Sequence, residues 1–225
     1  MKKNDPATLL IHRIAAVVGH ELRNPLAVIN NSAYFLKAKL GPGAEPKVAK
    51  HLSIIESEIA RADRLISDIV AYSRPLELRL SQFSLNGLLR ELIDEYESVP
   101  GRKVGRELCP GELSIQGDKG ALEEALRKLL DNAFDAADAA GKVSVSTAAG
   151  PAGPVVAVSD TGPGIDPKVR ETLFDPFVTT KPRGLGLGLA SALKAVAAHH
   201  GTLTLQDRAG GGTVAIAALP SKQGA

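Results

Sequence analysis

The amino-acid sequence predicts an α+β protein in two parts, a long antiparallel helical hairpin followed by a mixed α/β domain. Between Thr8 and Arg74, apolar residues recur in alternating steps of three and four on both sides of the segment GPGAEP. After residue 84, helical periods are interspersed with the alternation of apolar and polar residues that is typical of strands. The two patterns meet near Pro75, where we expect the second helix to end.

Both halves of the expected hairpin carry a heptad seam, the apolar pattern of helical bundles. The seam of the second helix consists of Leu52, Ile55, Ile59, Ala62, Ile66, Ile69 and Ser73. The first helix has a rougher seam at Ile11, Ala15, Val18, Leu22, Pro25, Ile29, Ala33, Leu36 and Leu40. Two helices of about 30 residues cannot form a bundle core alone, so we expect a homodimer with a four-helix bundle. The alternative is a two-helix arm that packs on its own second domain.

The second half combines helices and strands in a domain of about 140 residues without an internal repeat. Its first helix is expected from Ser84 to Tyr96, with Ser84 or Asn86 as the N-cap. The remaining elements are expected at 119–141 (an amphipathic helix closed by Gly141), 142–148 and 155–160 (strands), 187–201 (a helix closed by Gly201), and 202–207 and 213–220 (strands).

Composition narrows the function classes. The chain has 225 residues, of which 44% are hydrophobic and 23% charged, and its net charge is +2. This balance predicts neither nucleic-acid binding nor attraction to a membrane surface. The single cysteine, Cys109, cannot form an intramolecular disulfide. No apolar run reaches the roughly 20 residues that span a bilayer, and the N-terminus lacks a signal-peptide core. We therefore expect a cytoplasmic protein without direct membrane insertion.

Three segments of the second half have the residue types of a phosphate-binding site. The segment DTGPGI begins with Asp160 at the end of an expected strand, which aims a carboxylate at a ligand beside two glycines. The segment GLGLGLA opens a helix, where backbone N–H groups bind phosphates. Asn132 shares one face of the 119–141 helix with Lys128 and Asp135. Taken singly, each has a plainer explanation, because acids start turns and glycines punctuate loops.

In this order, the segments resemble the ATP-binding domain shared by sensor histidine kinases, DNA gyrase and related ATPases. LRKLLDNAFDAA is similar to the N box of that family, DTGPGI to its first glycine box, LFDPF to its F box and GLGLGLA to its second glycine box. The resemblance covers nearly all of residues 84–220. It implies an α/β sandwich that binds ATP and Mg²⁺.

The resemblance also implies roles for individual residues. Asp160 would accept a hydrogen bond from the adenine amino group, with Gly162 and Gly164 in the same loop, and Asn132 would hold a Mg²⁺ ion bridged to the phosphates. The triphosphate would be wrapped by Gly184, Gly186 and Gly188. The segment PFVTTKPRG corresponds to the mobile ATP lid, and its shortness is most like the nitrogen-regulation branch of the kinases, which places Thr180 and Lys181 near the phosphates.

A histidine on the first helix acquires a function once an ATP-binding domain is attached. Val18 and Leu22 belong to the seam, so His20 between them is expected on the outward face. Such a histidine is ordinarily just solvated, and no second histidine or cysteine lies at metal-ligand spacing. A neutral imidazole is nevertheless a competent nucleophile toward a γ-phosphoryl group when a carboxylate such as Glu21 orients it and accepts its proton.

The segment GHELRNPL resembles the H box of histidine kinases. The resemblance makes His20 the phosphoacceptor, and it makes Asn24 the residue that orients a water for hydrolysis of the phosphorylated partner. Pro25 removes a backbone donor and loosens the helix below His20, unless it is a purely structural kink. The family also docks the receiver domain of a response regulator on the outer surface after the histidine, here Ala27, Asn31, Ser32, Tyr34 and Phe35.

Two residues depart from the family pattern, and one of them, Leu185, stands without explanation where a small polar residue is common. Lys128 stands where histidine kinases have a second asparagine and gyrase-like ATPases have a general-base glutamate. A charged lysine can neither ligate Mg²⁺ nor accept a proton, although it can neutralise a phosphate. The sequence therefore predicts a histidine kinase core that phosphorylates His20 and transfers the group to a response-regulator aspartate, with phosphatase activity toward that regulator. A catalytically weakened phosphotransfer scaffold, or pseudokinase, is the alternative, and Lys128 argues against a third reading, a gyrase-like ATPase.

The expected domains are 1–75 for dimerisation and the phosphoacceptor histidine, 76–83 for a linker, 84–220 for the catalytic ATP-binding domain and 221–225 for a tail.

Overall fold

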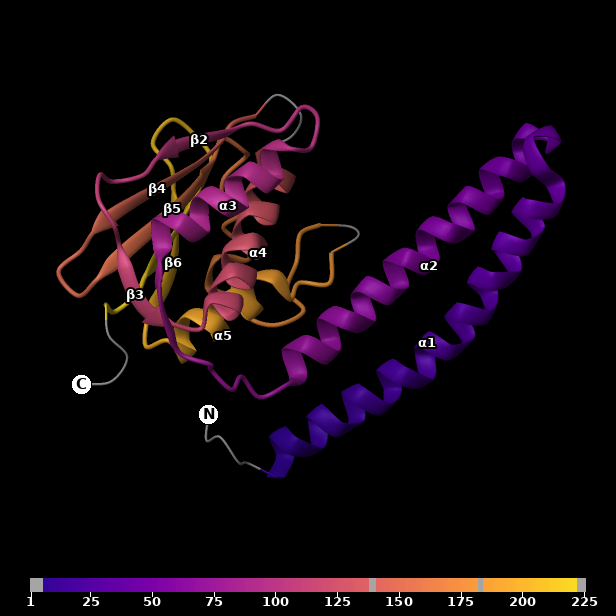
Figure 1. Ribbon diagram of the computed structural model, residues 1–225, viewed down its shortest axis with the longest axis horizontal. Coiled ribbons are helices and arrows are strands. Elements are labelled where there is room, and N and C mark those ends of the chain that lie inside the picture. Colours follow the sequence, from indigo (N-terminus) through magenta and orange to yellow (C-terminus); the bar gives the residue numbers. More distant parts are fainter. Residues whose placement is uncertain (1–5, 138–140, 182–183, 222–225) are drawn as a thin grey trace. The chain divides into compact units, whose positions relative to one another are not determined.

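The computed structural model describes residues 6–137, 141–181 and 184–221, and the chain forms two compact units, Met1–Pro75 and Leu76–Ala225. The first unit is the predicted antiparallel hairpin of α1 (Pro6–Leu40), a 3₁₀ turn (Gly41–Gly43) and α2 (Pro46–Ser73) (Figure 1). Pro46 occupies the first turn of α2, where its missing N–H costs nothing, and Arg74 is extended in front of Pro75. The expected helices and turn are confirmed.

Gly19 of α1 lies in close contact with α2. A β-carbon there would lie 2.7 Å from Cγ2 of Val70 and 3.2 Å from Cγ2 of Ile66, so only glycine fits without displacing α2. One turn later, Arg23 donates to Asp63 Oδ1 at 3.0 Å and to Ser67 Oγ at 2.8 Å. These contacts fix the rotation of α1 against α2.

Much of the predicted seam remains exposed in the single hairpin. Ala33, Leu52 and Ile66 are buried, together with Gly19 and Val70, which lie beside the predicted seam. The exposed seam positions are Val18, Leu22, Pro25, Ile29, Leu36 and Leu40 on α1 and Ile55 and Ile69 on α2. The side chain of Ile11 lies outside the described residues. One hairpin therefore buries only part of the apolar stripe that the sequence encodes.

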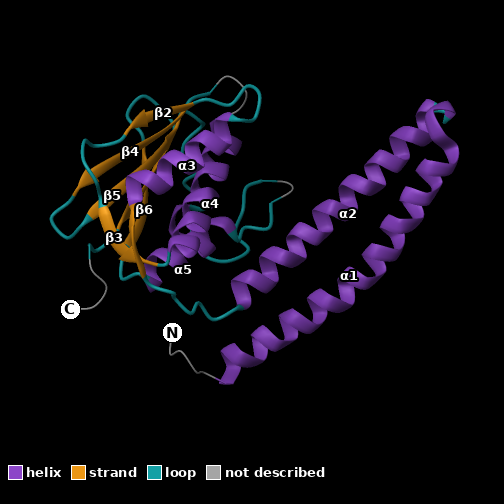
Figure 2. Ribbon diagram, in the orientation of Figure 1, coloured by secondary structure: helices purple, strands orange, loops and turns teal. Residues whose placement is uncertain are grey.

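The second unit is an α/β layer structure, in which three helices cover one face of a five-stranded sheet (Figure 2). Its elements are β1 (Ser81–Ser84), α3 (Leu85–Glu97), β2 (Val104–Glu107), β3 (Ser114–Gly117), α4 (Lys119–Ala137), β4 (Val143–Ala149), β5 (Pro154–Asp160), a 3₁₀ turn (Arg170–Thr172), α5 (Gly188–Ala198), β6 (Thr202–Asp207) and β7 (Thr213–Ala218). The strand order is β2-β4-β5-β7-β6, parallel between β2 and β4 and otherwise antiparallel. β1 and β3 form a separate antiparallel pair.

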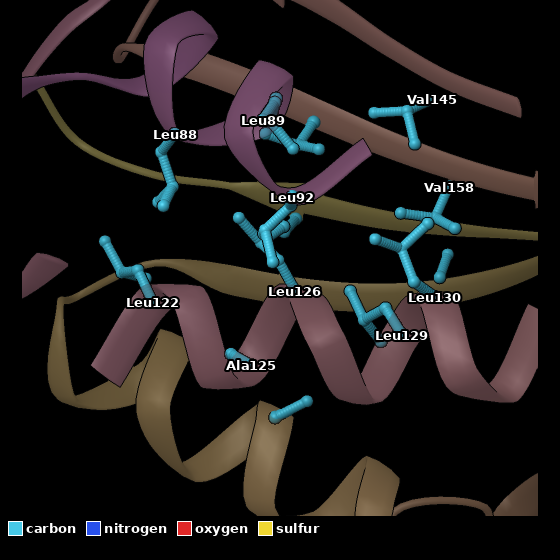
Figure 3. Close-up of a cluster of buried hydrophobic side chains, with 14 of the residues drawn as sticks. Leu88, Leu89, Leu92, Leu122, Ala125, Leu126, Leu129, Leu130, Val145 and Val158 are labelled. Carbon is cyan, nitrogen blue, oxygen red and sulfur yellow. The ribbon is translucent and has the colours of Figure 1, made fainter. Parts of the chain in front are cut away.

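A continuous apolar core lies between the helices and the sheet (Figure 3). Leucines of α3 and α4 face valines of β4 and β5, and Val145 and Leu130 are fully buried. The apolar stripe of the amphipathic α4, Leu122, Leu126, Leu129, Ala133 and Ala137, is buried throughout. Because this stripe faces the core, the opposite face of α4 is left for polar residues.

The predicted strands β4 to β7 and helices α3 to α5 are confirmed, with ends shifted by a few residues. Ser84 is the N-cap of α3 and accepts from the Gly87 N–H. Asn86 is instead a buried link, which donates to the carbonyls of Cys109 and Gly111 and accepts from the Thr147 hydroxyl. The short strands β1, β2 and β3 were not anticipated, and β1 begins at Ser81, inside the expected linker. Residues 138–140, before the expected closing Gly141, lie outside the described residues.

Candidate functional site

Asp160 is the last residue of β5 and its side chain is only 4% exposed. Its Oδ1 accepts hydrogen bonds from the Gly162 N–H at 2.8 Å and from the Thr213 N–H at 3.2 Å. Both bonds fall on one oxygen, and within the described residues no hydrogen bond reaches Oδ2. A buried carboxylate fixed in this way can present its second oxygen to a ligand donor.

The loop after Asp160 packs tightly against the end of α4. A β-carbon at Gly162 would lie 2.5 Å from the carbonyl oxygen of Ala136, one helical turn beyond Asn132. A β-carbon at Gly212 would lie 2.0 Å from the carbonyl oxygen of Asp160. Glycine at these two positions lets the β5 end approach both α4 and the start of β7, so the Asp160 loop and the polar face of α4 border one region.

Asn132 and Asp135 converge on a single cation at the polar face of α4. The Lys181 ammonium donates to Asn132 Oδ1 at 2.8 Å and to Asp135 Oδ2 at 2.9 Å. Asn132 is half-buried, whereas the Asp135 side chain is 61% exposed. The structure thus brings together Asn132 and Lys181, two residues that the sequence predicts near phosphates.

The glycine segment leads into α5 without a capping side chain. Leu187 precedes the first turn and is buried, and the N-cap makes no side-chain hydrogen bond. A β-carbon at Gly188 would meet no atom within 4 Å, so this glycine borders open space. The first backbone N–H groups of α5 therefore remain candidates for an anion.

The remaining predicted lid residues are partly constrained. The Gly184 N–H donates to the Lys181 carbonyl, and the Gly186 carbonyl accepts from the Phe177 N–H. Thr180 is exposed. Outside the lid, Gly164 of the Asp160 loop has a φ of +85°. Pro182 and Arg183 of the expected lid lie outside the described residues. Lys128 is half-buried one turn before Asn132 on α4.

A neighbouring acid on α4 has a structural role. Asp131 accepts from the Tyr96 hydroxyl at 2.5 Å, and Tyr96 stacks on Phe134 at a centroid distance of 5.5 Å. Burial, and then the hydrogen bond to Asp131, raise the pKa of Tyr96 above its ordinary value, which keeps the hydroxyl protonated and donating. Asp131 therefore belongs to the α3–α4 contact rather than to the polar face with Asn132.

On the hairpin, His20 and Glu21 are exposed neighbours, as predicted. Their side chains are 75% and 72% exposed, and His20 Nδ1 lies 3.7 Å from Glu21 Oε1. Asn24 and Pro25 are exposed on the following turn. Because Pro25 has no N–H, the Glu21 carbonyl lacks its normal helical donor. The structure thus presents an accessible imidazole whose Nδ1 faces a carboxylate.

Sequence reasoning missed several residues that shape these sites. Thr213 supplies a donor to Asp160 from 53 positions away, which no local pattern indicates. Gly212 is part of a run of three glycines, and that run was an available signal for a tight turn. Gly19 and Arg23 stand inside the segment that carries His20, yet their contacts depend on the rotation of α2.

Comparison with known proteins places both units in families. Residues 11–77 match the His Kinase A (phospho-acceptor) domain, and residues 117–223 match the histidine kinase-, DNA gyrase B-, and HSP90-like ATPase family. The signal transduction histidine-protein kinase AtoS of Escherichia coli is 31% identical over 92% of this chain and 34% of its own length. Sporulation kinase C of Bacillus subtilis is 28% identical over 93% of this chain and 49% of its own length. The chain thus spans between a third and half of these curated relatives.

Two solved structures are similar to this chain over nearly its whole length. Full-length ShkA in complex with AMPPNP has a TM-score of 0.75 and 26% identity over 95% of this chain and 46% of the other. The histidine kinase ThkA in complex with the response regulator protein TrrA has a TM-score of 0.70 and 28% identity, over 98% of this chain and 64% of the other.

A phosphoacceptor-type helical hairpin followed by an ATPase-type α/β unit defines the catalytic core of a two-component sensor kinase. The chain belongs to the histidine kinase family. Within the described ranges, no helix is both long and apolar enough to cross a membrane.

A pair of Asp160 variants separates the structural and ligand roles of this carboxylate. Asp160→Ala leaves two buried N–H donors unpaired, so we expect a loss of about 1–3 kcal/mol in the free energy of unfolding. Asp160→Asn retains Oδ1 for both donors and should lose less. Urea unfolding followed by circular dichroism measures both values, and equal losses in the two variants would contradict the assigned hydrogen bonds.

Proposed function

We propose that the chain binds ATP with Mg²⁺, phosphorylates its own His20 and transfers the phosphoryl group to an aspartate of a response-regulator receiver domain. The observation that carries this proposal is the exposed His20–Glu21 pair on a chain that also has a histidine kinase ATPase unit with a buried, ligand-ready Asp160. Residues 1–75 act as the dimerisation and phosphoacceptor domain, 84–220 as the catalytic domain, 76–83 as the linker and 221–225 as a tail.

Recognition of adenine is assigned to Asp160. Its Oδ1 is occupied by two backbone donors, so Oδ2 accepts the hydrogen bond from the adenine amino group. Gly162 and Gly164 let the backbone of the loop approach the base. Because the carboxylate is buried, a correctly paired donor is favoured strongly over a substituent that cannot donate.

Phosphate binding is assigned to the polar face of α4 and the start of α5. Asn132 supplies an amide oxygen that already lies against a cation, the Lys181 ammonium, and oxygen is the ligand that Mg²⁺ takes in proteins. When bound, the metal neutralises charge on the phosphates. Thr180, Lys181 and the N–H groups of Gly184, Gly186 and Gly188 contact the phosphate oxygens. Lys128, one turn from Asn132, is an additional phosphate contact.

The tautomer of His20 that carries its proton on Nδ1 is the form that accepts the phosphoryl group. Glu21 attracts the proton on Nδ1, which leaves the lone pair on Nε2 free to attack the γ-phosphorus. The new Nε2–P bond forms as the bond from the γ-phosphorus to the bridging oxygen breaks and ADP leaves. The excess positive charge on the imidazole is relieved when the Nδ1 proton moves toward Glu21.

Labelling with γ-³²P-ATP and Mg²⁺ tests the proposed activity. We expect acid-labile, alkali-stable label on the native chain, none on His20→Gln, and full labelling of the matched control His51→Gln, which alters an exposed histidine on α2. Asp160→Asn should lower ATP binding and labelling at least tenfold.

Two outcomes would contradict the kinase proposal. ATP binding without label would favour the phosphotransfer scaffold that Lys128 allows, and phosphate release undiminished in His20→Gln would favour an ATPase.

The response regulator is expected on the outer surface of α1. A groove there is lined by Val28, Asn31, Ser32, Phe35 and Leu36. It shares Asn31, Ser32 and Phe35 with the surface predicted from sequence, and Phe35 is 60% exposed. An apolar groove with a few polar groups, just below His20 on the same helix, suits a protein partner.

Phosphatase activity is assigned to Asn24, exposed one turn after His20. We expect Asn24→Ala to reduce the stimulated dephosphorylation of a phosphorylated receiver domain at least tenfold, while labelling of His20 persists. Asn30→Ala, an exposed asparagine on the same helix, serves as the control. Decay of phosphorylated receiver on Phos-tag gels measures the rate, and equal decay with both variants would contradict the role of Asn24.

A homodimer is proposed because the apolar stripe of the hairpin is incompletely buried. Leu22 and Ile29 lie seven residues apart, and each is about half exposed. Light scattering should give twice the chain mass for the native protein and the chain mass for Ile29→Glu. Ala27→Glu adds the same charge on the outward face and should remain dimeric. Dimers of Ile29→Glu would contradict this interface.

A further inference from the structure

The inference concerns the cation that Asn132 and Asp135 share, and it rests on the proposed ATP-binding function. These side chains lie three positions apart on α4, and both place an oxygen within 2.9 Å of Lys181 Nζ. An amide oxygen and a carboxylate oxygen therefore converge on one point, and a positive charge already occupies that point. Ligands spaced at i and i+3 on one helix face are a known way to build a metal site.

The donor set suits Mg²⁺ in particular. Mg²⁺ binds through one or two protein oxygens and completes its shell with substrate phosphates and waters. Across the described part of the chain, no group of three or more His, Cys, Asp or Glu side chains forms a self-sufficient metal site. A metal at Asn132 would therefore need one further protein ligand and the phosphate oxygens of the nucleotide.

Asp135 is the acid of this helix face that can serve as that second ligand. Asp131, one turn before Asp135, already accepts a hydrogen bond from the Tyr96 hydroxyl. Lys128, one turn before Asn132, carries an ammonium and cannot ligate a cation. The negative charge that balances a divalent ion on this face comes from Asp135.

We propose that Asp135 is a protein ligand of the nucleotide-bound Mg²⁺, together with Asn132, and that the Lys181 ammonium holds this place before the metal binds. Replacement of the Lys181 ammonium by the metal costs little. The Lys181–Asp135 contact is a surface ion pair, with side chains 38% and 61% exposed, and such pairs are weak. A released Lys181 is then free to contact a phosphate oxygen.

Binding of Mn²⁺ to the full chain tests this ligand directly, with ADP as the nucleotide so that no turnover is needed. Electron paramagnetic resonance measures free Mn²⁺ during titration of the ADP complex. We expect Asp135→Asn to weaken Mn²⁺ binding about tenfold or more, Asp135→Glu to restore most of it, and Lys181→Ala to strengthen it. Glu124→Gln removes one exposed carboxylate from α4, about three turns from Asp135, and should match the native chain.

Metal-free ADP binding, measured by calorimetry, separates this inference from the proposed function. Asp135→Asn should bind ADP without metal at least as well as the native chain, because the carboxylate no longer holds Lys181. Mn²⁺ affinity unchanged in Asp135→Asn would overturn the ligand assignment. If ADP binding rises while Mn²⁺ affinity stays constant, Asp135 only restrains the lysine, and the proposal is also overturned. Failure of the native chain to bind any adenine nucleotide would contradict the proposed function itself.

Discussion

The contact of Gly19 with Val70 and Ile66 is the constraint on which the phosphoacceptor helix depends. With 2.7 Å available to a β-carbon at Gly19, α1 is held against α2 in one rotation. Successive residues of an α-helix are rotated by about 100°, since a turn takes 3.6 residues. The residue after a buried Gly19 therefore turns away from α2, and the His20 side chain stays accessible. The paired bonds of Arg23 to Asp63 and Ser67 maintain the same rotation one turn below.

In the α/β unit, the main constraint is that the carboxylate of Asp160 must be held in a buried position. Asp160 accepts from two backbone donors, one in the following loop and one 53 residues further along the chain, and two glycines allow these segments to close around it. The core beneath α4 is apolar throughout, so the helix offers one polar face to the ligand region. Asn132, Asp135 and Lys181 meet on that face. Ligand recognition and the core thus use opposite sides of a single helix, and packing fixes the position of the polar side chains.

Most of the fold could be predicted because its signals are local or periodic. The heptad pattern gave both hairpin helices, Ser84 gave the start of α3, and alternation gave β4 to β7. The four-residue strands β1, β2 and β3 were missed because segments this short carry too little periodicity. Asn86 illustrates the remaining difficulty, since an asparagine near a helix start resembles a cap and is here a buried link to Cys109, Gly111 and Thr147.

The candidate site was predictable in its residues more than in its contacts. The motifs identified Asn132, Asp160, Lys181 and His20, but the meeting of Lys181 with Asn132 depends on a loop 49 residues further along the chain. The seam likewise predicted apolar positions without distinguishing those buried between the two helices, such as Ile66, from those left for another surface, such as Ile29.

The central claim is that ATP delivers its terminal phosphoryl group to Nε2 of His20. The most direct measurement is ¹H–¹⁵N NMR of the chain labelled with [¹⁵N]histidine, recorded before and after incubation with ATP and Mg²⁺. The account predicts that the ring of one histidine, assigned to His20, changes to the pattern of an Nε2-phosphorylated imidazole. Phosphorylation at Nδ1, or modification of one of the other four histidines, would contradict it.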